Sequence, residues 1–181
     1  MKSSFIMAGL MLSFARAGAQ ADPAGAAPPA PFIKSLTARI VSAKPQLHGI
    51  EDRKEQVTLC LTGIYTQGEV LYYRLLLINH ASVAFDPGLL RFCIRDRKMI
   101  RRHSFQEVDQ QALLAYGNME ALGAGERRVW IVALPKEIPS GAQYLVIDLV
   151  ERRGGRHLQL RVGSRKILRA KIVNDLQLQG Y

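Results

Sequence analysis

The sequence Val57-Thr-Leu-Cys-Leu-Thr62 decides the fold, because its apolar and polar side chains alternate residue by residue. Successive side chains of a β-strand point to opposite faces, so this alternation predicts a strand with one buried face. Residues 90–95 and 158–162 repeat the pattern. Three further runs are almost continuously apolar, which is typical of strands covered on both faces: residues 70–78, 129–134 and 144–150.

Glycine and proline separate these segments, at Gln67-Gly68, Asp86-Pro87-Gly88, Pro139-Ser140-Gly141, Gly154-Gly155 and Gly163-Ser164. Short strands divided by turn residues predict an all-β fold, an Ig-like antiparallel β-sandwich of about seven to nine short strands. Residues 144–152, 156–162 and 165–173 are expected to form an antiparallel meander. Residues 107–128 are interpreted as one long loop that contains a short helical turn near residues 112–116.

The chain has 181 residues, of which 48% are hydrophobic, and its formal net charge is +10. This composition excludes a disordered, fibrous or membrane-embedded protein and favours one soluble domain. The excess of lysine and arginine indicates an acidic partner or a polyanion.

The N-terminal residues have the order of a secretory signal. Lys2 precedes a mostly apolar run over residues 5–14, and small residues follow at Ala15, Ala17, Gly18 and Ala19. We therefore expect residues 1–19 to be a signal peptide, with no transmembrane segment after its cleavage, and the protein to lie in the periplasm or on the periplasmic face of the outer membrane. Residues 20–34 are predicted to be an Ala/Pro-rich flexible tether, residues 35–175 a single domain and residues 176–181 a C-terminal tail.

The residues that carry chemistry are scattered. The four histidines do not pair at metal-ligand spacing, and the sequence contains no phosphate-binding loop and no nucleophile motif. We therefore expect no metal, no cofactor and no enzymatic activity. Cys60 and Cys93 form either one disulfide bond or two inert thiols. Arg74 and Asp148 interrupt apolar strands, so they either pair with each other or lie apart, as an arginine that reaches solvent and an aspartate at a strand edge.

Basic residues gather in two clusters, within residues 95–102 and 152–171. The candidates for direct contact with a partner are Arg97, Lys98, Arg101, Arg102, Arg152 and Arg153. Such clusters are either a solvated face or a binding site for an acidic protein surface or an anionic envelope polymer. Aromatic residues are not interleaved with them, so direct contact with nucleic acid is not expected.

Several sequence blocks together resemble the conjugative-transposon TraN family, in its C-terminal domain. The first blocks are Leu61-Thr-Gly-Ile-Tyr65, Tyr72-Tyr-Arg-Leu-Leu76, Asn79-His-Ala-Ser82, Phe85-Asp86, Leu90-Arg-Phe92, Ile94-Arg-Asp96 and Gln106-Glu107. The later blocks are Leu134-Pro-Lys136, Ile138-Pro139 and Glu151-Arg-Arg-Gly-Gly-Arg-His157. The resemblance spans most of the chain, from about residue 48 to residue 173.

The resemblance implies an exported subunit of a conjugative, type IV secretion-like DNA-transfer apparatus. Such a subunit acts by assembly with other envelope subunits and has no catalytic residues. The matching residues are expected to be structural: Asn79, Ser82, Asp86, Arg95, Asp96, Gln106, Glu107, Pro135, Gly154, Gly155, Arg156 and His157. Asn79 and Ser82 would brace a turn, and Gly154 and Gly155 would supply positive φ to a hairpin. The chain differs from typical family members because a tether stands in place of a larger N-terminal region. A stand-alone periplasmic module that binds an anionic polymer or nucleic acid is the alternative function.

Overall fold

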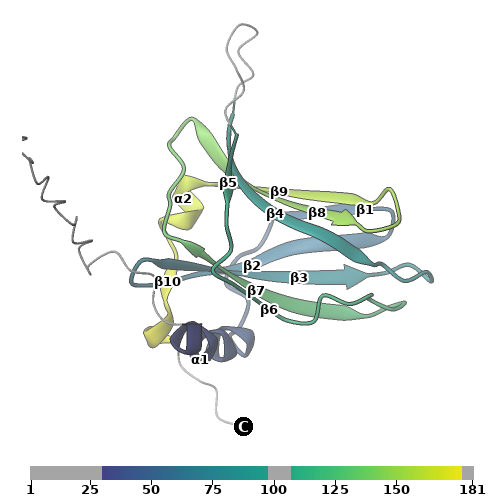
Figure 1. Cartoon of the computed structure of the whole chain (residues 1–181), viewed down its shortest axis with the longest axis horizontal. Coiled ribbons are helices and arrows are strands. Elements are labelled where there is room, and N and C mark those ends of the chain that lie inside the picture. The colour runs from purple at the N-terminus through teal and green to yellow at the C-terminus, as the bar shows by residue number, and fades with distance from the viewer. Residues whose placement is uncertain (1–29, 98–106, 177–181) are drawn as a thin grey trace, which may run out of the picture.

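Two β-sheets pack face to face in the computed structural model, which describes residues 30–97 and 107–176 (Figure 1). The six-stranded sheet contains, in spatial order, β1 (Glu51–Lys54), β2 (Val57–Gln67), β3 (Val70–Asn79), β7 (Arg127–Pro135) and β6 (Leu114–Tyr116), with β10 (Lys171–Ile172) beside the end of β2. The four-stranded sheet contains β5 (Glu107–Gln110), β4 (Pro87–Asp96), β8 (Gln143–Glu151) and β9 (His157–Gly163). The prediction of an all-β sandwich is therefore confirmed.

The alternating segments place their apolar side chains between the two sheets. Val57, Leu59 and Leu61 are at most 1% exposed, and the apolar residues of β9 are similarly buried. Trp130 lies in the same core and donates a hydrogen bond from Nε1 to the carbonyl oxygen of Asn118, 2.8 Å away. Burial of this apolar surface is the main stabilising contribution to the sandwich.

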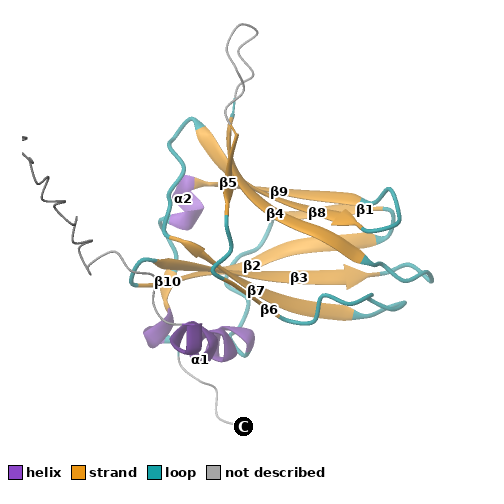
Figure 2. Cartoon of the chain, in the orientation of Figure 1, coloured by secondary structure: helices purple, strands orange, loops and turns teal. Residues whose placement is uncertain are grey.

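Helix α1 (Ala30–Val41) packs on the outer face of the six-stranded sheet (Figure 2). Leu36 and Ile40, one helical turn apart, contact a cluster that includes Tyr65 and Tyr72. The sequence did not predict this helix, which begins inside the proposed tether, five residues before the expected start of the domain. Proline lacks an N–H donor, but the first helical turn does not need that donor, so Pro31 is compatible with the helix.

Residues 107–128 do not form a loop with a helical turn. They contain β5, which pairs with residues Phe92 to Arg95 of β4, and β6, which pairs with β7. The helical turn expected near residues 112–116 is instead the strand Leu114–Tyr116. Pairing with distant strands overrides the weak local preference of this short segment.

The predicted meander is correct for its first two strands and wrong for the third. β8 and β9 pair antiparallel, but residues 165–173 leave that sheet. They form helix α2 (Ser164–Ile167), strand β10, which runs parallel to β2 in the other sheet, and the start of a 3-10 helix, η2 (Val173–Asp175). Ile167 is 2% exposed in the core between the sheets, and this burial accounts for the departure from the strand pattern.

The loop between β8 and β9 also differs from expectation, because neither Gly154 nor Gly155 has positive φ. Five residues separate the two strands, so the tight two-residue turn that requires positive φ is not formed. Gly154 is required for space, since an added Cβ would collide with the carboxylate of Glu151. Gly155 has open space around it. Among the described residues, neither α-helix is long and apolar enough to cross a lipid bilayer.

Candidate functional site

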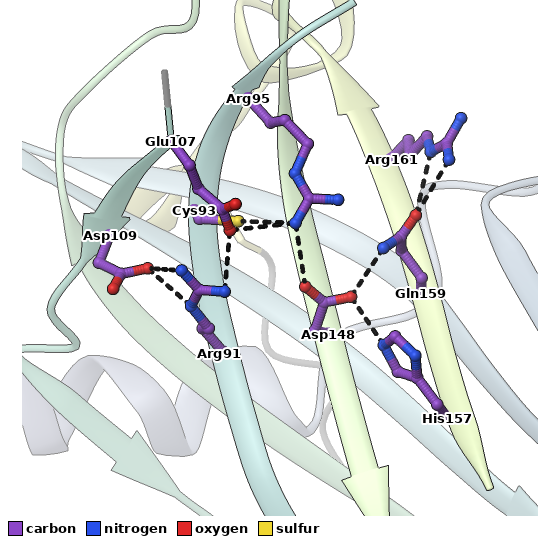
Figure 3. Close-up of polar contacts among 9 residues, drawn as sticks. All are labelled: Arg91, Cys93, Arg95, Glu107, Asp109, Asp148, His157, Gln159 and Arg161. Carbon is purple, nitrogen blue, oxygen red and sulfur yellow. Dashed lines mark hydrogen bonds and ion pairs between the residues drawn. The ribbon is translucent and has the colours of Figure 1, made fainter. Parts of the chain in front are cut away.

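The outer face of the four-stranded sheet carries polar and charged side chains from all four strands (Figure 3). The backbone register brings them together, because Arg95 lies opposite Glu107 of β5 and Asp148 lies opposite Gln159 of β9. We call this group the charged face; its members are Arg91, Arg95, Glu107, Asp109, Asp148, His157, Gln159 and Arg161. The inward-facing residues of the same strands belong to the core.

Two arginines of β4 bind the carboxylates of β5. Arg91 contacts Asp109 at 2.6 Å and Glu107 at 2.8 Å, and Arg95 contacts Glu107 at 3.0 Å. Hydrogen bonds from the Cys93 thiol and from Arg95 hold the pKa of Glu107 below its usual value. Glu107 therefore remains charged near neutral pH, and the ion pairs neutralise charge across the two strands.

Asp148 is the most buried carboxylate of the charged face, with a side chain 9% exposed. Its Oδ1 atom lies 2.9 Å from the Nε2 atom of His157 and accepts a hydrogen bond of 2.9 Å from Gln159. Its Oδ2 atom lies 3.8 Å from the guanidinium of Arg95. Asp148 lies in β8, between β4 and β9, so the expectation of an aspartate at a strand edge is wrong.

Arg74 does not pair with Asp148, because it lies on the outer face of the other sheet. Its guanidinium is buried, donates to Thr62 Oγ1 at 2.7 Å and contacts the carbonyl oxygen of Val41 at 3.4 Å. Burial lowers the pKa of Arg74. An arginine at this carbonyl interacts favourably with the C-terminal end of α1, so Arg74 fastens the helix to the sheet.

Cys60 and Cys93 are both free thiols, and the disulfide alternative is contradicted. They lie on different sheets, in β2 and in β4. Cys93 is fully buried beneath the charged face, although its position on the polar side of β4 suggested a wetter environment. The pKa of each thiol is raised to about 11, mainly by burial and also by a hydrogen bond to, and the negative charge of, Glu51 for Cys60 and Glu107 for Cys93.

Because only the thiolate reacts with alkylating reagents, both cysteines are expected to react slowly with iodoacetamide at pH 8. Cys93 should react more slowly than Cys60, since its side chain is completely covered. Unfolding without a reductant should release two reactive thiols per chain. Mass spectrometry of the alkylated protein measures the alkylation rate of each cysteine and the number of thiols released by unfolding. A non-alkylated, disulfide-linked fraction would contradict this prediction.

A largely buried ion pair joins Glu151, at the end of β8, to Arg156, just before β9; their side chains are 9% and 11% exposed. Arg156 also donates to the carbonyl oxygen of Ala84 at 2.7 Å and lies over the ring of Phe85. The hydrogen bond from Arg156 is the main cause that lowers the pKa of Glu151. This pair ties the loop between β8 and β9 to the loop that precedes β4.

Because the pKa of Glu151 is lower in the folded protein, its ionised form stabilises the fold at pH values above the unfolded-state pKa of about 4.3. This stabilising contribution is lost as the pH falls through the lowered pKa of the folded state. Glu151→Gln is therefore expected to be less stable than the wild type at pH 7, with a difference that narrows as the pH falls below about 4. Urea unfolding at pH 7, 5, 4 and 3 measures this difference. A constant difference across the series would show that ionisation of Glu151 does not contribute.

The fully buried Asn79 joins the loop after β3 to the loop before β7. Its side-chain amide donates to the carbonyl oxygens of Val83, Leu122 and Gly123, and its oxygen accepts from the N–H of Ala81. Ser82 does not brace a turn as expected, because its exposed side chain forms no hydrogen bond with the described residues.

The remaining predicted site residues are dispersed. Asp96 accepts a hydrogen bond from Gln143, Asp86 lies 3.8 Å from Arg152, and Pro135 ends β7 opposite Val70. Arg97 lies over the ring of Tyr144, and Arg153 is exposed in the loop after β8. Lys98, Arg101, Arg102 and Gln106 lie outside the described residues.

Sequence reasoning missed Arg91, Asp109, Gln159 and Arg161 as members of the charged face. The alternation of residues 90–95 showed that Arg91 shares a face with Arg95. It contained no information on the partner strands, because β5 was not predicted as a strand.

Three side chains place possible metal-ligating atoms within 4.8 Å of one another: Cys93, Glu107 and Asp109. However, Arg91 and Arg95 already bind both carboxylates, and the thiol is protonated at neutral pH. The adjacent positive charges oppose binding of a divalent cation.

A search of curated proteins finds no match to this sequence. A family model described as a domain of unknown function, DUF4138, matches residues 31–172. The matched region begins within α1 and ends with β10, so it spans both sheets. The chain therefore belongs to the DUF4138 family.

Proposed function

We propose that this protein is a non-catalytic, exported assembly subunit of a conjugative DNA-transfer apparatus of the type IV secretion-like class. It acts by docking to other envelope subunits. The sequence blocks that resemble the conjugative-transposon TraN family support the apparatus, and the apolar run followed by small residues at 5–19 supports export.

One observation is the main support for the docking role. Most of the described residues that match the TraN family form contacts that hold the fold together. Asn79 ties two loops together, Glu107 binds two arginines of β4, and the Glu151–Arg156 pair joins two loops. Residues that serve the scaffold in this way preserve the shape of a surface. Because the residues that carry the resemblance mainly support the fold, a docking module explains them best.

The chemistry of the charged face supports the same proposal. The thiol of Cys93 is protonated near neutral pH and buried, so it is a poor nucleophile. The carboxylates beside it are bound by arginines. Ion pairs of this kind fix the register of strands at modest energetic gain.

The test uses donor cells that carry the complete set of transfer genes and an affinity-tagged copy of this chain. After chemical crosslinking, the tagged chain should be recovered from the envelope fraction together with other products of the transfer genes. A tagged, unrelated exported protein is the control. Recovery from the cytoplasm, or recovery with the same proteins as the control, would contradict the proposal.

Unpaired cations near the end of β9 support the alternative, a periplasmic module that binds an anionic polymer or nucleic acid. Arg165, Lys166 and Arg169 are exposed and form no ion pair with described residues. Binding to DNA through phosphates would weaken steeply with salt, in proportion to the number of phosphates neutralised. A flat salt titration with duplex DNA would exclude this alternative.

A further inference from the structure

The segment that connects the two sheets after β9 is firmly anchored. We call residues 164–172 the crossover segment; it comprises α2, a turn and β10. Ile167 is buried in the core between the sheets, and Val173, directly after the segment, is fully buried in the cluster beneath α1. Strand β10 pairs with Tyr65 and Thr66 of β2. Anchoring at both ends holds the outward-facing side chains on a stable backbone.

Those outward-facing side chains form an uncompensated basic surface. Arg165, Lys166, Arg169 and Lys171 are exposed, and none forms an ion pair with a residue of 30–97 or 107–176. On the charged face, by contrast, Arg91 and Arg95 each meet at least one carboxylate. The positive charge of the crossover segment is therefore available to an external anionic group.

Two large apolar side chains of the same segment are exposed as well. Leu168 is 67% exposed and Ile172 is 50% exposed. An apolar centre bordered by charged residues is the usual arrangement of a protein–protein interface. Exposed leucine and isoleucine gain free energy only when another apolar surface covers them, and a phosphate backbone does not provide such a surface.

The neighbouring aromatic residue does not offer a platform for nucleic-acid bases. The guanidinium of Arg97 lies 4.2 Å from the ring centroid of Tyr144, and its Nε donates to the carbonyl oxygen of Gln143. Arg97 thereby covers that face of the ring and adds a positioned cation beside Gly163, just before the crossover segment. Single-stranded nucleic acid normally requires open aromatic faces for stacking.

We propose that the crossover segment is the docking surface for an acidic partner protein, with Leu168 and Ile172 inserted into an apolar depression and the surrounding cations facing carboxylates. This inference rests on the proposed function and specifies the chemistry of the partner. Arginine is well suited to the role because its planar guanidinium binds a carboxylate through two parallel hydrogen bonds.

The test measures binding of the purified full chain to three probes: a glutamate–tyrosine copolymer, poly-L-glutamate and duplex DNA. The variant Arg165→Gln/Lys166→Gln/Arg169→Gln removes three charges from the crossover segment. The matched control Lys44→Gln/Arg53→Gln/Arg127→Gln removes the same residue types from exposed positions elsewhere. A third variant, Leu168→Ser, removes apolar surface and leaves the charge unchanged. Thermal unfolding checks that each variant is folded.

We expect the copolymer to bind more tightly than poly-L-glutamate or DNA. The crossover variant should bind the copolymer about tenfold more weakly than the wild type, because three interfacial charge pairs are lost, and the control should stay within about twofold. Leu168→Ser should also weaken copolymer binding about tenfold and change poly-L-glutamate binding little.

Equal weakening in the crossover and control variants would show that only net charge matters and would overturn the inference. Preference for DNA, or no binding to the copolymer, would also overturn it. None of these results would contradict the proposed function, which is tested by crosslinking in donor cells and does not depend on these probes.

Discussion

Replacing Asp148 with alanine is expected to lower the free energy of unfolding by about 3 kcal/mol, because a buried and multiply bonded carboxylate is removed. Gln159 and His157 would each lose a partner 2.9 Å away, and Arg95 would lose a nearby negative charge. The change would leave these polar groups on the charged face without their acceptor. Guanidinium chloride unfolding at pH 7 measures the loss.

Asp109→Ala is the matched control for this prediction. Asp109 forms a shorter ion pair than Asp148 does, 2.6 Å from Arg91, but its side chain is 64% exposed. Solvent screens exposed ion pairs, so the control should lose much less stability despite its shorter contact. If both variants lost equal stability, burial of Asp148 would not be the source of its contribution.

Replacing Asn79 with alanine is expected to cost about 3 kcal/mol, since several buried backbone groups lose their hydrogen-bond partner. The carbonyl oxygens of Leu122 and Gly123 both accept from the Asn79 amide. These contacts join the end of β3 to the loop before β7. Urea unfolding, followed by fluorescence of the single tryptophan, Trp130, measures the change.

Asn118→Ala provides a matched control with the same local turn. Each asparagine accepts a hydrogen bond from the N–H two residues later, at 3.0 Å for Asn79 and 2.7 Å for Asn118. Asn118 is exposed, and its side-chain amide donates a hydrogen bond to the carboxylate of Glu120. Its replacement should cost less than about 1 kcal/mol, because water can replace the lost partners. Equal losses would show that the bonds to Leu122 and Gly123 contribute nothing.

The sequence predicted the inward faces of the strands well, since alternation is a local property. Val57, Leu59 and Leu61 lie in the core as their spacing indicated. The charged face was not predicted, because it depends on pairing between segments far apart in the chain. Nothing near Asp148 in sequence indicates that Arg95 of β4 lies beside it. Likewise, Arg74 is explained by a helix that the sequence did not reveal.

The helix α1 and the crossover segment were missed for different reasons. The prolines before residue 32 hid the start of α1, although the first turn of a helix tolerates proline. Residues 165–173 follow the short Gly163-Ser164 turn, so they were expected to form the third strand of a meander. Burial of Ile167 between the sheets and of Val173 beneath α1 outweighs that local pattern.

The frequency of conjugative DNA transfer tests the docking role most directly. A donor strain that lacks this chain should fail to transfer DNA, and the wild-type chain should restore transfer. The double variant Cys60→Ser/Cys93→Ala, which has no thiol, should restore transfer as well, because the account assigns no chemistry to either cysteine. Normal transfer in the deletion strain, or failure of the folded, thiol-free variant to restore it, would contradict the account.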